Sequence, residues 1–322
     1  MRLPTRGALA ALVLCAAALA SHAEDYPSKP IRFIVPWPPG GGADVSARII
    51  GQRVGELIGQ TLVIDNRPGA GGNIGAEVAA HATPDGYTIL FGYVGTHAIN
   101  PGLYRTMPFE PSELAPVTLM NTVSNILVVH PALPAHSVIE LIALARARPG
   151  TLNFSSSGNG SLPHLAGELF KTMTGADMVH VPFKGGGPSV AALIAGEVQL
   201  AFADPLAAMP GIKGGQLRAL GVTGATRSQG MPELPTIAES GVPGFEATGW
   251  NGLLVPAGTP APIIAKLHDS FVAALKTPTL RERLIEQAYD PVGSTPAAFA
   301  AFIAAETAKW GKVIQESGAR LD

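Results

Sequence analysis

The chain has 322 residues, a formal net charge of −2 at neutral pH and only 14% charged residues. It contains no run of Lys or Arg, so nothing in it supports a nucleic-acid groove or a surface that binds anionic membranes. A chain of this length is expected to form one large or two medium-sized domains, and a single cysteine excludes a disulfide framework within it.

Residues 1–23 are expected to be a cleaved signal peptide rather than part of the fold. Arg2 and Arg6 precede an apolar run at 8–20 that is too short for a transmembrane helix, and a small-x-small motif follows the run. Lipidation fits poorly, because Cys15 lies in the middle of the apolar run. The sequence therefore predicts an exported protein whose mature chain folds without disulfides.

Short apolar segments then alternate with helical segments along the chain. Strands are predicted at 31–37, 61–65, 88–92, 125–130, 152–156, 178–183, 200–204, 217–223 and 252–256. Helices are predicted at 44–58, 74–82, 137–147, 163–173, 188–196, 261–275 and 296–316. Most strand candidates are continuous apolar runs, which are typical of parallel strands buried on both faces. The alternation predicts an α/β, doubly wound architecture.

This many strands would be unusual in one sheet, and the segments 125–134 and 247–260 resemble connections between two units. We therefore expect one lobe at 25–124 plus 250–322 and a second lobe at 125–249. Two crossover strands would join the lobes, and a ligand cleft would lie between them. A single large sheet is the alternative.

Five predicted strands are each followed by a loop rich in glycine or hydroxyl groups. The loops are PWPPGGGAD, YVGTHAIN, SGNGSLPH, KGGGPS and DPLAAMP. In open parallel sheets, ligands bind at the carboxyl ends of strands, where helix N-termini present N–H groups that suit anions. We expect all five loops to face one cleft and to bind a carboxylate or phosphate.

Nucleotide-binding patterns fit these loops poorly. The triple glycine at 40–42 is not followed by the Gly-Lys-Ser/Thr of a P-loop, and Gly69, Gly71 and Gly75 have the wrong spacing for a dinucleotide fingerprint. Asp44 would either cap the helix that follows the triple glycine or contact a ligand.

No motif in the sequence provides a complete catalytic or metal site. No GxSxG, HExxH or calcium-loop pattern occurs, although Ser161 precedes His164 by three residues. His164 and His97 are expected at the rim of the cleft rather than as bases. Lys184 would attract an anion or remain a solvated loop residue, and Trp37 and Phe183 would form aromatic walls or fill the core.

Five segments together resemble the Bug family, the extracytoplasmic solute receptors of tripartite tricarboxylate transporters. They are 26–50, 63–92, 155–170, 180–202 and 217–260, in the family's order and over nearly the whole mature chain. The resemblance implies a type II periplasmic binding protein whose two α/β lobes close on a ligand. It also implies small carboxylate ligands (di- and tricarboxylates, acidic amino acids, aromatic acids) held mainly by main-chain amides, hydroxyls and ordered waters.

Carried over by position, the resemblance implies a set of ligand-binding residues spread over five loops. They are Trp37, Gly41, Gly42, Ala43, Asp44, Tyr93, Thr96, His97, Ser157, Asn159, Ser161, His164, Lys184 and Asp204. The family commonly has Phe-Asp-Asn/Ser where this chain has Phe202-Ala203-Asp204, so the acidic residue is displaced by one position. This displacement favours a ligand without an amine.

The resulting prediction is a monomeric, non-catalytic periplasmic receptor, without metal or cofactor, that delivers a carboxylate to membrane permease subunits. One alternative is a ligand-sensing receptor that signals to a membrane sensor kinase. The other is a hydrolase that uses Ser161 or Ser157 with His164.

Overall fold

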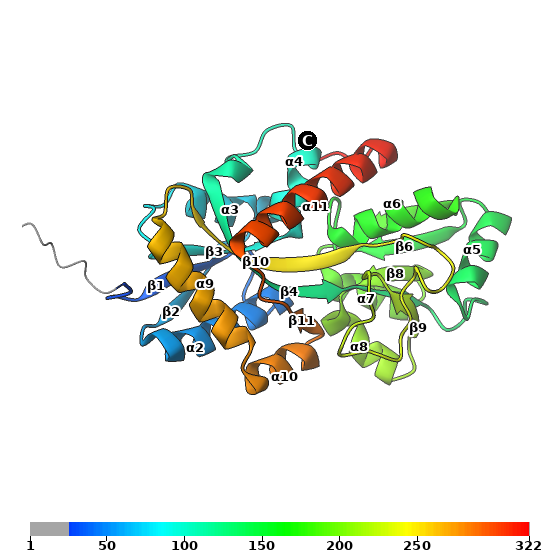
Figure 1. Ribbon diagram of the computed structural model, residues 1–322. Helices are drawn as coiled ribbons and strands as arrows, with labels where there is room; N and C mark the ends of the chain where they lie inside the picture. Colours follow the sequence, from blue (N-terminus) through cyan, green and yellow to red (C-terminus); the bar gives the residue numbers. More distant parts are fainter. Residues whose placement is uncertain (1–25, 322) are drawn as a thin grey trace, which may run out of the picture.

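The computed structural model describes residues 26–321 and shows two α/β lobes side by side (Figure 1). The expected signal peptide at 1–23 lies outside the described residues. We call the half built on the first sheet lobe 1 and the half built on the second sheet lobe 2. No helix among residues 26–321 is long and apolar enough to cross a membrane.

Lobe 1 contains a six-stranded sheet in the order β11-β4-β10-β3-β1-β2. Strands β1 (Ile31–Val35), β2 (Leu62–Asn66) and β3 (Thr88–Tyr93) are parallel, whereas β10 (Thr248–Pro256) runs antiparallel to both β3 and β4 (Leu114–Ser124). The edge strand β11 (Tyr289–Pro291) is antiparallel to β4.

Helices cover both faces of this sheet. The helices α2 (Gly42–Ile58), α9 (Ala261–Leu275) and α10 (Pro278–Glu286) pack on one face, and α3 (Asn73–Ala80), α4 (Asn100–Leu103) and α11 (Pro296–Ser317) lie on the other. Successive side chains of a strand therefore enter different cores: Phe33 packs with the first group and Ile34 with the second. Burial on both faces explains the continuous apolar runs.

Lobe 2 repeats the plan with a five-stranded sheet in the order β7-β6-β8-β5-β9. Its strands are β5 (Ile126–Val129), β6 (Leu152–Ser156), β7 (Met178–Pro182), β8 (Leu200–Ala203) and β9 (Arg218–Val222). Its helices are α5 (Val138–Ala147), α6 (Leu162–Thr174), α7 (Gly186–Ile194) and α8 (Pro205–Lys213). The C-terminal helix α11 extends from lobe 1 to α6 of lobe 2, so it contacts both halves (Figure 1).

Two crossover segments join the lobes. Strand β4 of lobe 1 leads into β5 of lobe 2 with only Asn125 between them, and the chain returns from β9 to β10. The two segments are tied together where they cross: Thr223 N–H donates to Asn125 O at 2.9 Å, and Ala247 N–H donates to Thr223 O at 2.8 Å.

The prediction of parallel sheets was wrong in detail, since both sheets are mixed. Strand β10 in lobe 1 and β5 in lobe 2 are antiparallel to their neighbours because each is the strand that enters its lobe from the other one. A strand buried on both faces has a continuous apolar pattern whichever way it runs, so the pattern could not reveal direction. Strands β4 and β11 and helices α8 and α10 were not predicted. The predicted helix at 261–275 coincides with α9.

Candidate functional site

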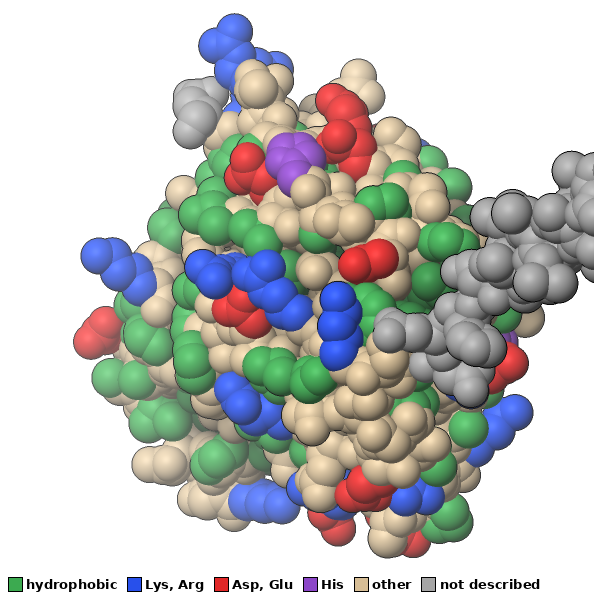
Figure 2. All heavy atoms as spheres, turned by 90° about the vertical axis from the view of Figure 1, so that its left-hand side faces the viewer, with side chains coloured by type: hydrophobic (Ala, Val, Ile, Leu, Met, Phe, Trp, Pro, Cys, Tyr) green, Lys and Arg blue, Asp and Glu red, His purple; other side chains and the backbone are tan. Residues whose placement is uncertain are grey.

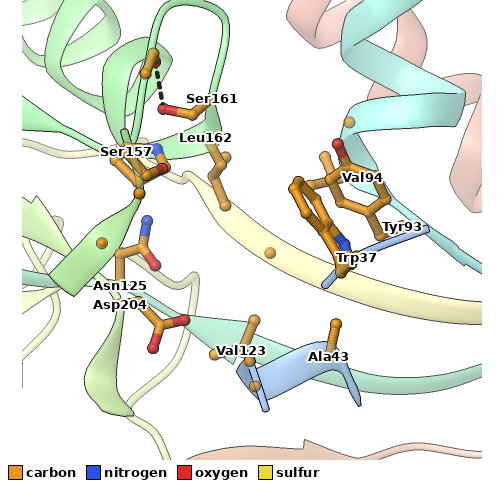
Figure 3. Close-up of a pocket in the computed structure, with 18 of the residues that line it drawn as sticks. Trp37, Ala43, Tyr93, Val94, Val123, Asn125, Ser157, Ser161, Leu162 and Asp204 are labelled. Atoms are coloured by element: carbon orange, nitrogen blue, oxygen red, sulfur yellow. Dashed lines mark hydrogen bonds between the residues drawn. The ribbon is translucent and has the colours of Figure 1, made fainter. Parts of the chain in front are cut away.

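A cleft of about 870 Å³ lies between the lobes, and all five glycine- or hydroxyl-rich loops contribute to its lining. These loops follow β1, β3, β6, β7 and β8, the parallel strands whose carboxyl ends point at the opposite lobe. Figure 3 shows Trp37, Tyr93 and Val94 of lobe 1 facing Ser157, Ser161 and Leu162 of lobe 2. Nine of the predicted binding residues line this cleft: Trp37, Gly41, Gly42, Ala43, Tyr93, Ser157, Asn159, Ser161 and Asp204.

The cleft presents the main-chain N–H groups of helix N-termini rather than cationic side chains. Four α-helices of the described chain have their N-cap residue in its lining: α2 at Gly41, α6 at Ser161, α7 at Gly185 and α8 at Asp204. No Lys, Arg or His is among the lining residues in the described part of the chain. Converging helix N-termini attract anions through their unpaired N–H groups and macrodipoles.

The lobe 1 wall is aromatic. Trp37 packs edge-on against Tyr93, with ring centroids 4.8 Å apart, and Tyr93 Oη donates a hydrogen bond to Gly71 O at 2.7 Å. Burial raises the pKa of Tyr93, so the side chain remains a neutral phenol. The wall thus offers flat apolar surface beside the amides of the glycine loop.

Asp44 lies behind this wall and does not line the cleft. Its carboxylate accepts hydrogen bonds from Gly40 N–H at 2.9 Å, Asn66 Nδ2 at 2.9 Å and Arg48 Nε at 3.0 Å. Burial favours the neutral acid, but these hydrogen bonds and the Arg48 charge outweigh it, so the pKa of Asp44 is lowered. Because the N-cap Gly41 has no side chain, Asp44 reaches back from inside α2 and holds the glycine loop.

Thr96 and His97 are also buried behind the cleft, in a π-helical turn at Gly95–Ile99. Thr96 Oγ1 and His97 Nδ1 share a hydrogen bond of 2.7 Å, and His97 Nε2 is buried without a partner. Burial lowers the pKa of His97 to about 4, so the ring is neutral at pH 7. Neither residue lines the cleft, although the family resemblance implied ligand contacts for both and His97 was expected at the rim.

The lobe 2 wall is a polar loop between β6 and α6. Ser161 is the N-cap of α6: its Oγ accepts from His164 N–H at 3.4 Å and donates to Gly158 O at 2.7 Å. The ring Nδ1 of His164 accepts from Gly160 N–H at 3.1 Å. His164 therefore supports the loop from behind and does not line the cleft.

His180, which the sequence analysis missed, completes this support. Its ring stacks on His164 with centroids 3.9 Å apart, and its Nε2 shares a hydrogen bond of 2.6 Å with Ser156 Oγ. Burial, followed by the charges of His164 and Lys171, lowers the pKa of His180 to about 3. A histidine in the middle of a predicted strand carries no sequence signal for such a role.

The geometry does not favour the serine hydrolase alternative. Ser161 Oγ donates to a backbone carbonyl, and the His164 ring is bonded to a backbone N–H rather than to that hydroxyl. The serine that pairs with a histidine is Ser156, which is 1% exposed and does not line the cleft.

Asp204 and Lys184 differ in position. Asp204 caps α8 by accepting from Leu206 N–H at 2.9 Å, and its carboxyl group is directed into the pocket (Figure 3). Burial raises the pKa of Asp204, against the hydrogen bonds from the helix N–H groups. Lys184 is exposed and does not line the cleft.

Several lining residues were not predicted, and some of them lie outside the five loops, in the crossovers and in β11. They include Val123, Asn125, Gly249, Trp250, Asn251 and Tyr289. Asn125 fell inside a predicted strand, and Tyr289 belongs to the unpredicted β11, so neither resembled a loop residue. Among the described residues, no group of three or more His, Cys, Asp or Glu is placed to hold a metal ion.

Comparison with known proteins places the chain in a family. Residues 46–319 match the model of the tripartite tricarboxylate transporter family receptor, TctC. BugT of Bordetella pertussis is 38% identical over 301 residues, which cover 93% of this chain and 92% of the relative.

Solved structures of similar proteins support the same family assignment. The Rhodopseudomonas palustris protein Rpa4515, determined with adipate, has a TM-score of 0.84 and 40% identity, covering 92% of this chain and all of that one. MatC (Rpa3494) of Rhodopseudomonas palustris, with bound malate, has a TM-score of 0.78 and 30% identity, covering 90% of this chain and all of that one. The chain belongs to the Bug-type receptor family of tripartite tricarboxylate transporters.

Proposed function

We propose that this protein is a periplasmic solute receptor that captures a small carboxylate by closure of its two lobes and delivers it to a tripartite tricarboxylate transporter. The observation that carries the proposal is the cleft in which four helix N-termini converge without a cationic side chain in its lining. Such a site suits a compact anion that accepts several N–H hydrogen bonds.

The ligand class follows from the size and polarity of the cleft. A volume of about 870 Å³ accommodates a di- or tricarboxylate, an acidic amino acid or an aromatic acid. Relatives with adipate and malate support a dicarboxylate, and the Trp37–Tyr93 wall would cover an apolar chain or ring between two acid groups.

We propose two roles for the predicted site residues. The nine that line the cleft contact the ligand, whereas Asp44, Thr96, His97 and His164 hold the contacting loops in place from behind. We assign Lys184 no contact with the ligand, because it is exposed and lies outside the lining.

Closure would move 25–124 plus 250–322 against 125–249. The separate sheets and the two crossover segments support these bodies, and the second boundary falls within β10. A ligand that contacts both walls binds the closed form better than the open form and so shifts the population toward closure.

The proposed periplasmic location and permease partner are supported by the family, and we propose that the protein acts as a monomer. The face at the free end of lobe 1 carries both acidic and basic side chains (Figure 2). Signalling to a sensor kinase would use the same closed form, so only the partner separates the two functions.

Isothermal calorimetry on the purified mature protein tests the proposal. The panel contains adipate, malate, citrate, glutamate and benzoate, with ATP and glucose as matched controls. We expect 1:1 binding to at least one acid and none to the controls. Binding only to ATP or glucose, or hydrolysis of an ester that Ser161→Ala abolishes, would overturn the assignment. Ligand uptake by vesicles that contain the permease subunits then distinguishes transport from signalling.

A further inference from the structure

Asn125 lies where the two crossover segments meet. It is the single residue between β4 and β5, and its carbonyl accepts the Thr223 N–H of the returning segment at 2.9 Å. Thr223 is in turn bonded to Ala247, by Ala247 N–H to Thr223 O at 2.8 Å and by Thr223 Oγ1 to Ala247 O at 2.9 Å. The backbone of Asn125 is therefore part of the connection about which the lobes must move.

The amide nitrogen of the Asn125 side chain is buried but has no hydrogen-bond partner. The residue is 4% exposed, and its Nδ2 has no hydrogen-bond partner. The other cleft-facing asparagine of the crossovers is satisfied, since Asn251 Nδ2 donates to Asn121 Oδ1 at 2.7 Å. Burying an amide without a partner is costly, so an exception within a well-paired region indicates a missing partner.

The missing partner is best placed in the cleft. Asn125 lines the cleft, and Figure 3 shows its carboxamide extending from the crossover toward the pocket between Ser157 and Asp204. A carboxylate oxygen at this position would take a hydrogen bond from the amide and could reach the Ser157 hydroxyl on the same wall.

We propose that Asn125 is a ligand-contact residue, whose amide donates to an oxygen of the bound carboxylate and links the ligand directly to the hinge. The proposal rests on the carboxylate-receptor function above and adds to it a residue outside the five loops. Asn125 belongs to the crossover, so its hydrogen bond to the ligand forms when the lobes close. The same bond then opposes reopening of the cleft. Its loss should therefore accelerate dissociation rather than slow association.

Two variants separate ligand contact from a structural role. Asn125→Ala removes the unpaired amide. Asn73→Ser is the matched control: Asn73 is 1% exposed, its Nδ2 is also unpartnered, and it does not line the cleft, but its Oδ1 accepts from Asn100 Nδ2 at 2.7 Å. Calorimetry and stopped-flow binding with the tightest acid of the panel give Kd and both rate constants. Thermal unfolding of the ligand-free proteins gives Tm.

For Asn125→Ala we expect Kd to rise about 10- to 100-fold, the range for a lost hydrogen bond to a charged group. The rise in Kd should come from a faster koff, and Tm should be unchanged or higher. For Asn73→Ser we expect a lower Tm and a Kd within about threefold of the wild type.

A Kd for Asn125→Ala within threefold of the wild type would overturn the proposal while leaving the receptor function intact. So would a Tm drop as large as that of Asn73→Ser, because the amide would then have a structural role. If the loss of affinity came from a slower kon instead of a faster koff, the claim that the Asn125 bond opposes reopening of the lobes would be overturned. If the wild type binds no acid of the panel, the proposed function itself fails, and this proposal fails with it.

Discussion

The two walls of the cleft present the same kind of loop, a strand end leading into a helix N-terminus, but they hold it in different ways. In lobe 1 the loop before α2 consists of glycines without side chains, and a charged group inside the helix, Asp44, ties it down. In lobe 2 the loop before α6 carries its own cap, Ser161, and rests on two neutral stacked rings, His164 and His180.

This difference shows what each wall can contribute to binding. In the lobe 1 loop Gly40 N–H is bonded to Asp44, but no side chain caps the N–H groups at the start of α2, and Trp37 and Tyr93 add apolar surface. The lobe 2 loop offers side chains that accept as well as donate. A carboxylate held between them would meet fixed amides on one side and adaptable hydroxyls on the other.

The largest effect should come from removing the charged support of lobe 1. Asp44→Ala leaves Gly40 N–H without its acceptor and removes the hydrogen bonds from Arg48 Nε and Asn66 Nδ2, so we expect a loss of about 2–3 kcal/mol in unfolding free energy and a Kd at least about tenfold weaker. Urea unfolding and calorimetry measure both.

Asp65→Ala is the matched control, since Asp65 pairs with Arg32 and Arg67 at the surface of lobe 1. It should cost less than about 1 kcal/mol and leave Kd unchanged. Equal losses for the two variants would refute a special role for Asp44.

Acid pH should weaken both walls, through the buried histidines behind them. Burial holds the pKa of His97 at about 4, below the 6.5 of the unfolded chain. Between these values the unfolded state binds more protons, so stability is fully present above pH 6.5 and is lost as the pH falls toward 4. His180 acts in the same direction in lobe 2.

We expect the charging of His97 to lower the unfolding free energy at pH 4.5 by about 2 kcal/mol relative to pH 7. His97→Phe keeps a ring near Phe109 and Trp250 and should reduce this difference by about that amount. Urea titrations of both proteins at the two pH values test this prediction. If His97→Phe showed the same difference as the wild type, His97 would not be a source of the acid sensitivity.

The smallest effect on stability is expected at Asp204, the one acidic group among the lining residues that the structure describes. Asparagine caps helices as well as aspartate, so Asp204→Asn should change the unfolding free energy by less than about 0.5 kcal/mol at pH 7, toward higher stability. The sign follows from the raised pKa: the folded state binds more protons above pH 3.8, so stability declines as the pH rises through that window.

Ligand affinity gives the sharper result at this residue. Removing a negative charge that faces an anion should strengthen carboxylate binding at pH 7 by up to about tenfold in Kd. Weaker binding of Asp204→Asn to glutamate would show an ammonium contact and contradict the expectation of a ligand without an amine.

Much of the fold could be predicted from the sequence because its signals are local. The apolar runs and helix periodicity placed nine strands and seven helices near their positions, and the glycine- and hydroxyl-rich loops marked the ends of strands that face the cleft. Strand direction could not be predicted, because a strand buried on both faces has the same continuous apolar pattern whether it is parallel or antiparallel to its neighbours. Strand β4 was missed since its apolar residues are interrupted by polar ones such as Thr118, Asn121 and Thr122.

The site divides in the same way. Local sequence was sufficient to identify Trp37, the glycines of the first loop and Ser161 as residues at the ends of strands. It could not show that Asp44, His97 and His164 turn away from the cleft to hold those loops, because hydrogen-bond partners such as Asn66 are distant in the chain. Nor could it show that Asn125 is left without a partner, which depends on how two segments about a hundred residues apart pack at the crossover. The sequence by itself determined which loops would line the cleft; the tertiary structure decided which of their side chains face it and which support its walls, because that depends on contacts between distant segments.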